Sequence, residues 1–226
     1  DLRLLRSFYA LGARYMTLTH TADLSWAGSS GGEGGVGLSA FGKQVIAEMN
    51  RLGMMVDIAH VSDRTFWDVI EASKAPVFSS HSSCRALSNI PRNLTDDMIR
   101  AVARKGGLVM INFGCEFLSQ ASADSSPWTN PALPRDRPAK VVRAKLADVV
   151  AHISHIRRIA GVDAVGLGSD FDGVSCTPEG LDDVSKWPNL TRALLESGYS
   201  AAEIRKIYGG NLLRFMKAVE RAAASR

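Results

Sequence analysis

Short β-prone runs alternate with helical patterns along most of this chain, and this alternation limits the fold more than any other feature. Strands that alternate with helices predict a parallel sheet, because each helix carries the chain back to the edge where the next strand begins. Five βα units can be counted, which predicts an α/β fold. The β-prone runs end at His20, His60, His81, Asn112–Phe113 and Asp170. Helical patterns cover residues 1–11, 39–52, 62–73, 95–104 and 140–160. Two or three more helices are expected in the tail. Residues 114–139 are expected to be an irregular excursion.

Two architectures fit this order of elements. No Gly-x-Gly-x-x-Gly turn follows the first β-prone run, which argues against a dinucleotide-binding fold. Five units do not close an eight-stranded barrel by themselves. The chain is therefore expected to form either an open doubly wound sheet or the later part of a barrel.

The composition is that of an ordinary globular protein and excludes few functions. The 226 residues are 46% hydrophobic and 22% charged, with a net charge of +4. No dense run of Lys and Arg and no nucleic-acid-binding motif is present, so a nucleic-acid partner is not expected. No apolar run approaches the length of a membrane span. The sequence starts within a helical pattern, so it leaves the cellular compartment undetermined.

The three cysteines, Cys84, Cys115 and Cys176, are far apart in the sequence. Their odd number and wide spacing favour neither a disulfide framework nor a zinc ribbon. We therefore expect isolated thiols near loops.

Histidines occupy three successive strand ends, and they are the main candidates for a functional site. In α/β barrels and in open α/β sheets, ligands bind at the carboxyl ends of the strands. His60 and His81 follow neighbouring runs, so their imidazoles could share one metal ion, and His20 lies at the same edge. Imidazole nitrogen and carboxylate oxygen are the usual ligands of catalytic zinc. The pattern predicts a metal site with His60 and His81 as ligands.

Charged side chains near the same edge suggest further roles. Asp170 lies in a Gly-Ser-Asp-Phe-Asp-Gly turn, where it could bind metal or act as a general base. Asp172 is expected to bond backbone amides of this turn. Arg92 lies in a polar loop after a histidine-bearing run, and its forked guanidinium group suits a substrate carboxylate. A salt bridge at the rim would explain Arg92 equally well.

Three other candidates are given structural interpretations. Glu33 lies among glycines and is expected to be solvated. His152 and His155 have a spacing that can hold a metal, but they lie within a helix away from the strand ends. We expect both to be surface or packing residues.

Taken together, these motifs resemble the membrane-dipeptidase (renal dipeptidase) family of zinc peptidases, metallopeptidase family M19. They include Val-Asp-Ile-Ala-His-Val-Ser, Phe-Ser-Ser-His-Ser-Ser and Val-Gly-Leu-Gly-Ser-Asp-Phe-Asp-Gly. The similar segments are residues 12–20, 37–42, 50–62, 75–83, 92–97, 165–173, 178–185 and 209–214. They cover nearly the whole chain in the expected order.

The resemblance implies a (β/α)₈ TIM barrel of the metal-dependent hydrolase type, with two Zn²⁺ ions and a metal-bridging hydroxide that attacks a dipeptide. It assigns His60 and His81 to metal binding and Arg92 to the substrate carboxylate. His20 would contact the substrate and help to hold the oxyanion, and Asp170 would handle the proton at the scissile amide, so both are catalytic and substrate-binding candidates.

The chain also departs from the family pattern. A His-x-Asp pair and a bridging Glu that family members use are not found, and neither Asp23 nor Glu33 replaces them. We therefore expect residues 1–226 to be a single domain that supplies about the last five βα units of the barrel. Its expected partners are a dipeptide and the missing N-terminal barrel segment, and a homodimer remains open. The alternatives are another amidohydrolase-type barrel hydrolase, made less attractive because no lysine lies at a strand end, and a non-catalytic barrel fragment.

Overall fold

The computed structural model describes residues 1–33, 35–134 and 140–224. All five predicted strands are present and form one parallel sheet in the order β1-β2-β3-β4-β5. The strands are β1 (Tyr15–Thr17), β2 (Met55–Asp57), β3 (Val77–Ser79), β4 (Leu108–Asn112) and β5 (Val165–Ser169). The spatial order equals the chain order, whereas a doubly wound sheet reverses its order at a switch point. The predicted α/β fold is confirmed, and the sheet has the winding order of part of a barrel.

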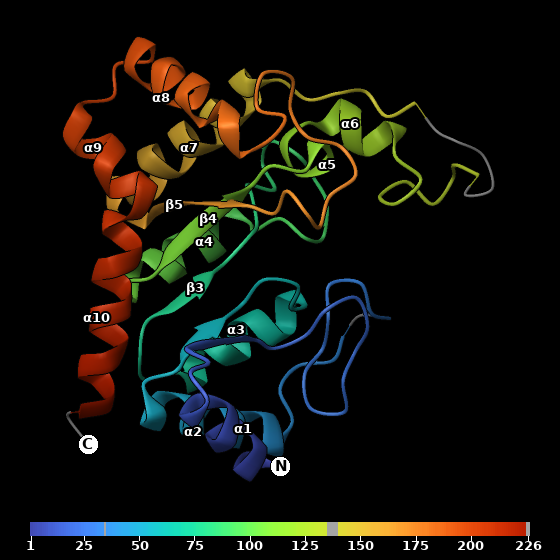
Figure 1. The fold of residues 1–226 in the computed structure, drawn as a ribbon. Coiled ribbons are helices and arrows are strands. Elements are labelled where there is room, and N and C mark those ends of the chain that lie inside the picture. Colours follow the sequence, from blue (N-terminus) through green and yellow to red (C-terminus); the bar gives the residue numbers. More distant parts are fainter. Residues whose placement is uncertain (34, 135–139, 225–226) are drawn as a thin grey trace.

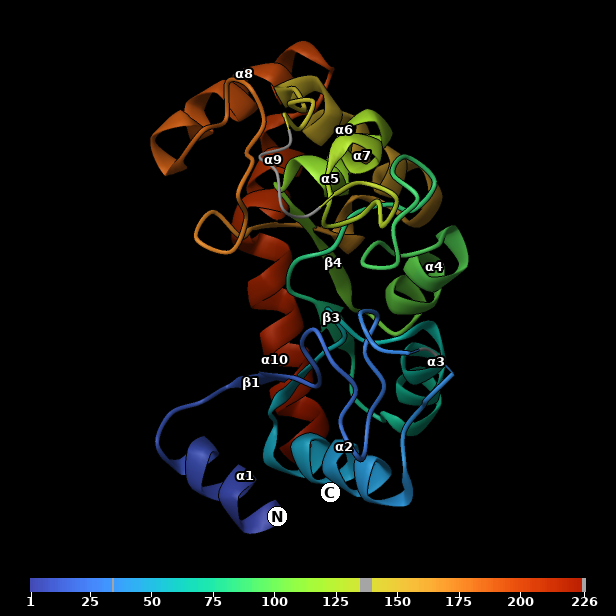
Figure 2. The same cartoon turned by 90° about the vertical axis from the view of Figure 1, so that its right-hand side faces the viewer.

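Helices cover the sheet on both faces, but unequally. The helices are α1 (Leu2–Ala10), α2 (Ala40–Leu52), α3 (Asp63–Ala72), α4 (Asp96–Arg104), α5 (Cys115–Leu118), α6 (Gln120–Ser125), α7 (Leu146–Ala160), α8 (Trp187–Glu196), α9 (Ala201–Arg205) and α10 (Asn211–Ala224). Helices α2, α3, α4 and α7 follow one another along one side of the sheet, while α10 crosses the other side (Figures 1 and 2). Within the described residues, no helix combines the length and the apolar character needed to cross a membrane.

Local capping signals explain where several helices begin. Ser39, Ser62 and Thr95 each accept a hydrogen bond from the backbone N–H three residues later, at the starts of α2, α3 and α4. Gly53 ends α2 with a φ of 77°, a left-handed conformation that glycine adopts without steric cost. These boundaries agree with the predictions to within one residue.

Two stretches differ from the predicted elements. Helix α7 begins at Leu146 rather than near residue 140. The excursion after β4 contains the short helices α5 and α6, which were not predicted because four and six residues are too few to show a helical period. Residues 135–139 of that excursion lie outside the described residues.

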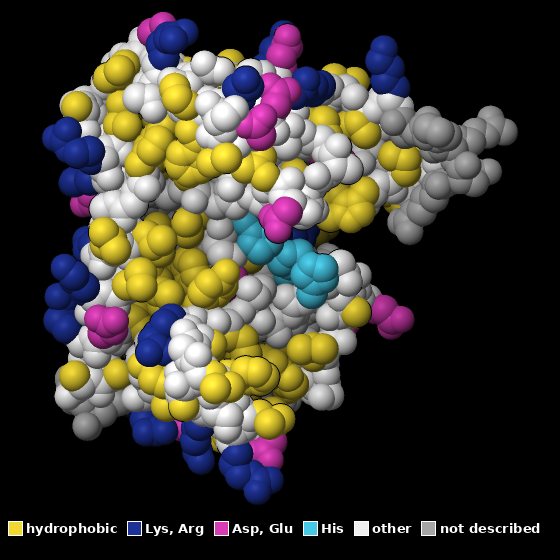
Figure 3. Space-filling model, in the orientation of Figure 1, with side chains coloured by type: hydrophobic (Ala, Val, Ile, Leu, Met, Phe, Trp, Pro, Cys, Tyr) yellow, Lys and Arg dark blue, Asp and Glu magenta, His cyan; other side chains and the backbone are white. Residues whose placement is uncertain are grey.

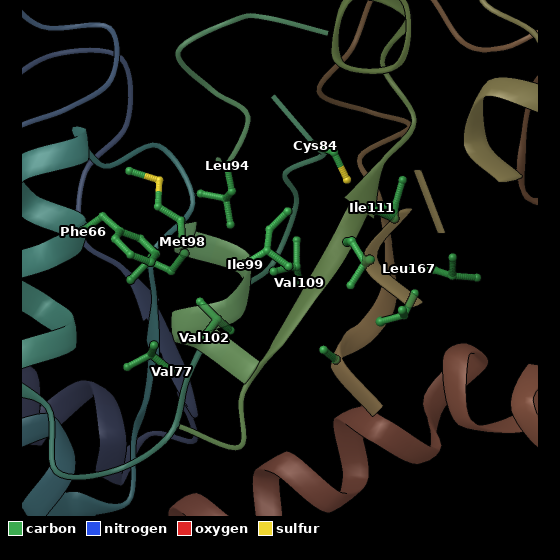
Figure 4. Close-up of a cluster of buried hydrophobic side chains, with 14 of the residues drawn as sticks. Phe66, Val77, Cys84, Leu94, Met98, Ile99, Val102, Val109, Ile111 and Leu167 are labelled. Carbon is green, nitrogen blue, oxygen red and sulfur yellow. The ribbon is translucent and has the colours of Figure 1, made fainter. Parts of the chain in front are cut away.

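Alternate residues of the strands face two different apolar clusters. Val77, Val109 and Ile111 pack against the helices α3, α4 and α7 in the larger cluster, part of which Figure 4 shows. Their neighbours Phe78 and Leu108 point to the other face, where Phe215 of α10 meets Phe78 with a ring-centroid distance of 5.0 Å. This two-residue period is that of a strand buried on both faces. Because both faces are filled by apolar side chains, the polar side chains gather at the strand ends.

A disulfide bond contradicts the expectation of isolated thiols. Cys115 at the start of α5 is bonded to Cys176 in the loop after β5, and Cys84 alone among the three cysteines is a free, buried thiol. The two bonded cysteines are 61 positions apart in the sequence, so no local spacing rule could indicate the pair. The pairing depends on β4 and β5 being neighbours in the sheet.

Reduction of this disulfide is expected to lower the free energy of unfolding by about 2–4 kcal/mol, because opening it frees a long loop in the unfolded chain. Denaturant unfolding with and without dithiothreitol measures the change. The double variant Cys115→Ser, Cys176→Ser is the control and should unfold at the same midpoint under both conditions. A wild-type midpoint that does not move, although thiol titration shows the bond to be open, would contradict this prediction.

The carboxyl ends of β3 and β5 converge, although β4 lies between them in the sheet. A methyl group on Gly168 of β5 would lie 2.0 Å from the carbonyl oxygen of Ser80, directly after β3. Two strand spacings in a flat sheet measure about 9.6 Å, so the sheet bends strongly at this edge. Glycine at position 168 permits this approach, which closes one end of the sheet around a common pocket.

Candidate metal and substrate site

All five site residues predicted from the sequence line one pocket of about 350 Å³ at the carboxyl ends of the strands. They are His20, His60, His81, Arg92 and Asp170. In Figure 3, histidine side chains gather in the hollow at the centre of the molecule. The volume lies within the usual range for small-molecule sites.

The three imidazoles of this pocket lie side by side. The ring centroids of His20 and His60 are 4.4 Å apart, and those of His60 and His81 are 4.9 Å apart. The Nε2 atoms of His60 and His81 face each other at 2.9 Å. His20 is exposed, whereas the other two are partly buried. The pair converges on one point of the pocket, and His20 flanks it.

Two site residues hold a strained backbone. His60 and Asp170 have φ values of 66° and 67°, and among the described residues they are the non-glycine positions with positive φ. A left-handed conformation costs an ordinary residue of order 1–3 kcal/mol and is concentrated at functional sites. Asp170 directly follows β5, and His60 lies three residues after the end of β2.

Electrostatics favour neutral imidazoles in the pocket. Burial lowers the pKa of His60 to about 3, and the nearby Arg92 guanidinium acts in the same direction. Burial followed by Arg92 also lowers the pKa of His81, although Asp170 and Asp57 oppose the effect. At neutral pH both rings are therefore uncharged, which is the form that binds a metal ion.

The His60 and His81 pair fits two ligand positions of one zinc ion. Two imidazole nitrogens bound at about 2.0–2.1 Å in tetrahedral geometry would lie about 3.3 Å apart, close to the 2.9 Å between the Nε2 atoms. Across the described residues, no group of three or more His, Cys, Asp or Glu side chains is arranged to hold a metal. The described residues thus supply two ligand positions, fewer than the four that zinc usually has.

A buried carboxylate beneath the imidazoles was not identified from the sequence. Asp57, at the end of β2, accepts hydrogen bonds from the hydroxyl groups of Thr17 and Ser80, both at 2.6 Å. The Ser80 hydroxyl in turn lies 2.6 Å from Nδ1 of His81. The signal available in the sequence was a lone aspartate inside the apolar run before His60, since a buried charge needs partners.

Asn112, at the end of β4, orients the candidate base. Its Nδ2 donates to Oδ2 of Asp170 at 2.9 Å, and its Oδ1 accepts from the backbone N–H of Gly114 at 2.6 Å. The asparagine is fully buried, so its amide has one orientation that satisfies both contacts. Sequence reasoning placed Asn112 at a strand end but assigned it no role.

Arg92 is buried and does not form the salt bridge considered from the sequence. Its guanidinium donates to the carbonyl oxygen of His81 at 3.1 Å, and its Nε–H finds no hydrogen-bond partner among the described residues. Burial lowers the pKa of Arg92 to about 10, so the group keeps its charge at neutral pH. Within residues 1–33, 35–134 and 140–224, no carboxylate forms a salt bridge with Arg92. The pocket therefore contains a cation that can receive an anionic group.

An aromatic wall beside Arg92 completes the pocket. The Arg92 guanidinium lies over the Phe117 ring at 5.2 Å, and Phe117 stacks with Trp128 at 5.7 Å. Both aromatic residues and Glu116 line the pocket, and they come from the excursion after β4. No periodic pattern of residues 114–139 indicates this wall in advance.

The remaining candidates lie outside the pocket. Glu33 is exposed, as expected. Asp172 is exposed too, and the backbone hydrogen bonds predicted for it stay a prediction. His152 is buried and receives a hydrogen bond from the backbone N–H of Cys84 at 2.9 Å. His155 pairs with Asp96 at 2.7 Å. Both histidines of α7 are packing residues.

Comparisons with known proteins place these features in a group of peptidases. The family model described as membrane dipeptidase, peptidase family M19, matches residues 1–226. An uncharacterized dipeptidase of Schizosaccharomyces pombe is 42% identical over 228 residues, a match that covers 99% of this chain and 50% of the relative. The chain therefore spans about half the length of this curated relative.

Two solved structures of peptidases are similar to this chain. A metallo peptidase from Rhodobacter sphaeroides, liganded with a phosphinate mimic of the dipeptide L-Ala-D-Ala, has a TM-score of 0.83 at 30% identity; the match covers 97% of this chain and 59% of the other. The probable dipeptidase PvdM from Pseudomonas aeruginosa has a TM-score of 0.86 at 27% identity, with 99% and 66% covered.

Proposed function

Since this chain belongs to the membrane dipeptidase family, peptidase family M19, we propose that it takes part in zinc-dependent hydrolysis of dipeptides that have a free C-terminal carboxylate. One observation carries the proposal. A pair of neutral imidazoles faces the same pocket as a buried guanidinium, for which the described part of the chain offers no carboxylate partner.

His60 and His81 are the proposed zinc ligands from this chain, through their converging Nε2 atoms. A bound zinc ion polarises a carbonyl group and lowers the pKa of water that it binds. Two imidazoles leave a zinc ion short of its usual four ligands. The proposal therefore requires further ligands for this ion, and for a second one, that the described residues do not supply.

Arg92 is the proposed binding group for the substrate carboxylate. A guanidinium binds a carboxylate through two parallel hydrogen bonds, and burial strengthens such a pair. The aromatic wall of Phe117 and Trp128 holds the guanidinium on one side. A carboxylate-binding group at the end of the pocket restricts the site to short peptides with a free C-terminus.

His20 and Asp170 are the proposed catalytic residues. His20 is exposed at the pocket edge, where its ring can donate a hydrogen bond to the carbonyl oxygen as negative charge develops there. Asp170, held by Asn112, can take a proton from the attacking water and deliver it to the leaving amine. Each role requires the side chain to touch the substrate or the water, and both residues line the pocket.

Zinc binding and dipeptide hydrolysis test this proposal directly. Metal content is measured by mass spectrometry after equilibrium dialysis, and hydrolysis of Gly-Asp and L-Ala-D-Ala by ninhydrin detection of the freed amine. Both assays are run on this chain and on a form extended at its N-terminus by the barrel segment that the family resemblance leads us to expect. We expect the extended form to bind two zinc ions and to cleave at least one of these dipeptides.

Single variants assign the metal to the pocket. His60→Ala and His81→Ala are expected to weaken zinc binding of the extended form severely, whereas His155→Ala should retain both ions because His155 lies on α7 beside Asp96. An extended form that binds two zinc ions yet cleaves no dipeptide would refute the proposed function. It would favour a barrel that binds ligand without catalysis.

A further inference from the structure

The Asp57 carboxylate is saturated with hydrogen bonds and has no free acceptor position facing the pocket. Its Oδ1 accepts from the backbone N–H groups of Ala59 at 3.0 Å and Ser80 at 2.9 Å. Its Oδ2 accepts from the hydroxyls of Thr17 and Ser80 at 2.6 Å. The residue is fully buried, and these four donors occupy the acceptor positions of both carboxylate oxygens. Asp57 is therefore an acceptor only.

This saturation determines the direction of the next hydrogen bond. The Ser80 hydroxyl has one proton, and it points that proton at the Asp57 oxygen, which cannot donate one in return. Ser80 can then only accept a hydrogen bond from Nδ1 of His81, 2.6 Å away. Nδ1 of His81 must carry the ring proton, and Nε2 carries the lone pair.

We propose that Asp57 and Ser80 are positioning residues that hold His81 as the Nδ1–H tautomer, with the Nε2 lone pair directed at the metal position. The inference rests on the proposed zinc site, and it adds two residues to which no role has been assigned. Outer partners of this kind fix the orientation of a ligand histidine and typically change metal affinity by about 10–100-fold when removed.

The same carboxylate aligns all three histidine-bearing strand ends. Thr17 belongs to β1 and precedes His20 by three positions, while Asp57 belongs to β2 and precedes His60 by three. Ser80 directly follows β3 and precedes His81. Within the residues that the structure describes, only the Ser80 branch of the network reaches an imidazole ring, so the two hydroxyls can be separated experimentally.

Asp57→Asn should reverse the direction of the hydrogen bonds that run from His81 through Ser80 to residue 57, here called the relay. The amide oxygen of asparagine would face the two backbone donors, so its NH₂ group would face the Ser80 hydroxyl. Ser80 would then accept from the amide and donate to Nδ1 of His81, which would place the ring proton on Nε2. We expect metal affinity to fall by at least ~10-fold. Ser80→Ala should also weaken affinity by ~10-fold or more, and Ser80→Thr should restore it because the hydroxyl is kept.

Two measurements test the relay. Long-range ¹H–¹⁵N spectra of the metal-free protein, labelled at histidine nitrogen, identify the His81 tautomer; Co²⁺ and Zn²⁺ competition titrations give metal affinity. We expect the Nδ1–H tautomer in the wild type and the Nε2–H tautomer in Asp57→Asn. Thr17→Val is the matched control: it removes an equally short hydrogen bond to the same Asp57 oxygen but touches no histidine.

The outcomes separate this inference from the proposed function. An Nε2–H tautomer of His81 in the wild type would overturn the relay whether or not the protein binds zinc. Equal losses of metal affinity in Thr17→Val and Ser80→Ala, with both variants folded by circular dichroism, would also overturn the relay. They would show that the network only holds the strand ends together. The expected tautomers in a protein that binds no zinc would support the relay and refute the zinc site instead.

Discussion

Replacing Asp170 with asparagine is expected to lower dipeptide turnover by at least ~10²-fold while zinc stays bound, which is the usual scale for loss of a general acid or base. Asparagine has nearly the same shape, and its amide oxygen can still accept the hydrogen bond from Nδ2 of Asn112. The variant therefore keeps the shape of the side chain and removes its negative charge together with its ability to carry a proton. The loss should appear in kcat, with KM nearly unchanged.

The measurement is steady-state hydrolysis of L-Ala-D-Ala by the N-terminally extended form, with zinc content determined on the same sample. Asp172→Asn is the matched control, since Asp172 lies two residues away in the same turn and is exposed. It should retain full turnover. Near-normal turnover in Asp170→Asn would remove Asp170 from its catalytic role, whereas loss of zinc would show that it is a metal ligand.

Replacing Arg92 with methionine is expected to raise KM for a dipeptide by ~30-fold or more, because truncating one member of a buried charge pair costs at least about 2 kcal/mol. Methionine fills similar volume over Phe117 and cannot bind a carboxylate. The wild type should discriminate strongly between a dipeptide and its C-terminal amide, and the variant should not.

Comparing the two substrates separates a binding role from a structural one. Arg92→Met should affect the free-acid dipeptide far more than the amide, while a structural defect would affect both equally. Arg85→Met is the control, since Arg85 is bound to Asp63 at 2.7 Å and does not line the pocket. If Arg92→Met keeps its preference for the free acid, another group binds the carboxylate.

The sequence by itself was sufficient for the parts of this protein that depend on neighbouring residues. Helix starts at Ser39, Ser62 and Thr95 follow from hydrogen bonds that span three residues, so they can be read locally. The alternation of strands and helices predicted the parallel sheet, and the position of His60 and His81 after strands predicted their common pocket. Their strand-end positions also predicted them as metal ligands, and family resemblance then assigned His20 to the substrate instead.

Tertiary structure alone decided the features that join distant segments. The Cys115–Cys176 bond requires that the segments after β4 and β5 lie side by side, and Arg92 is buried because the wall of Phe117 covers it. The Asp57 relay spans three strands, and the direction of its protons follows from how many donors surround one carboxylate. Such contacts arise from strand pairing and sheet curvature, which local periodicity does not encode.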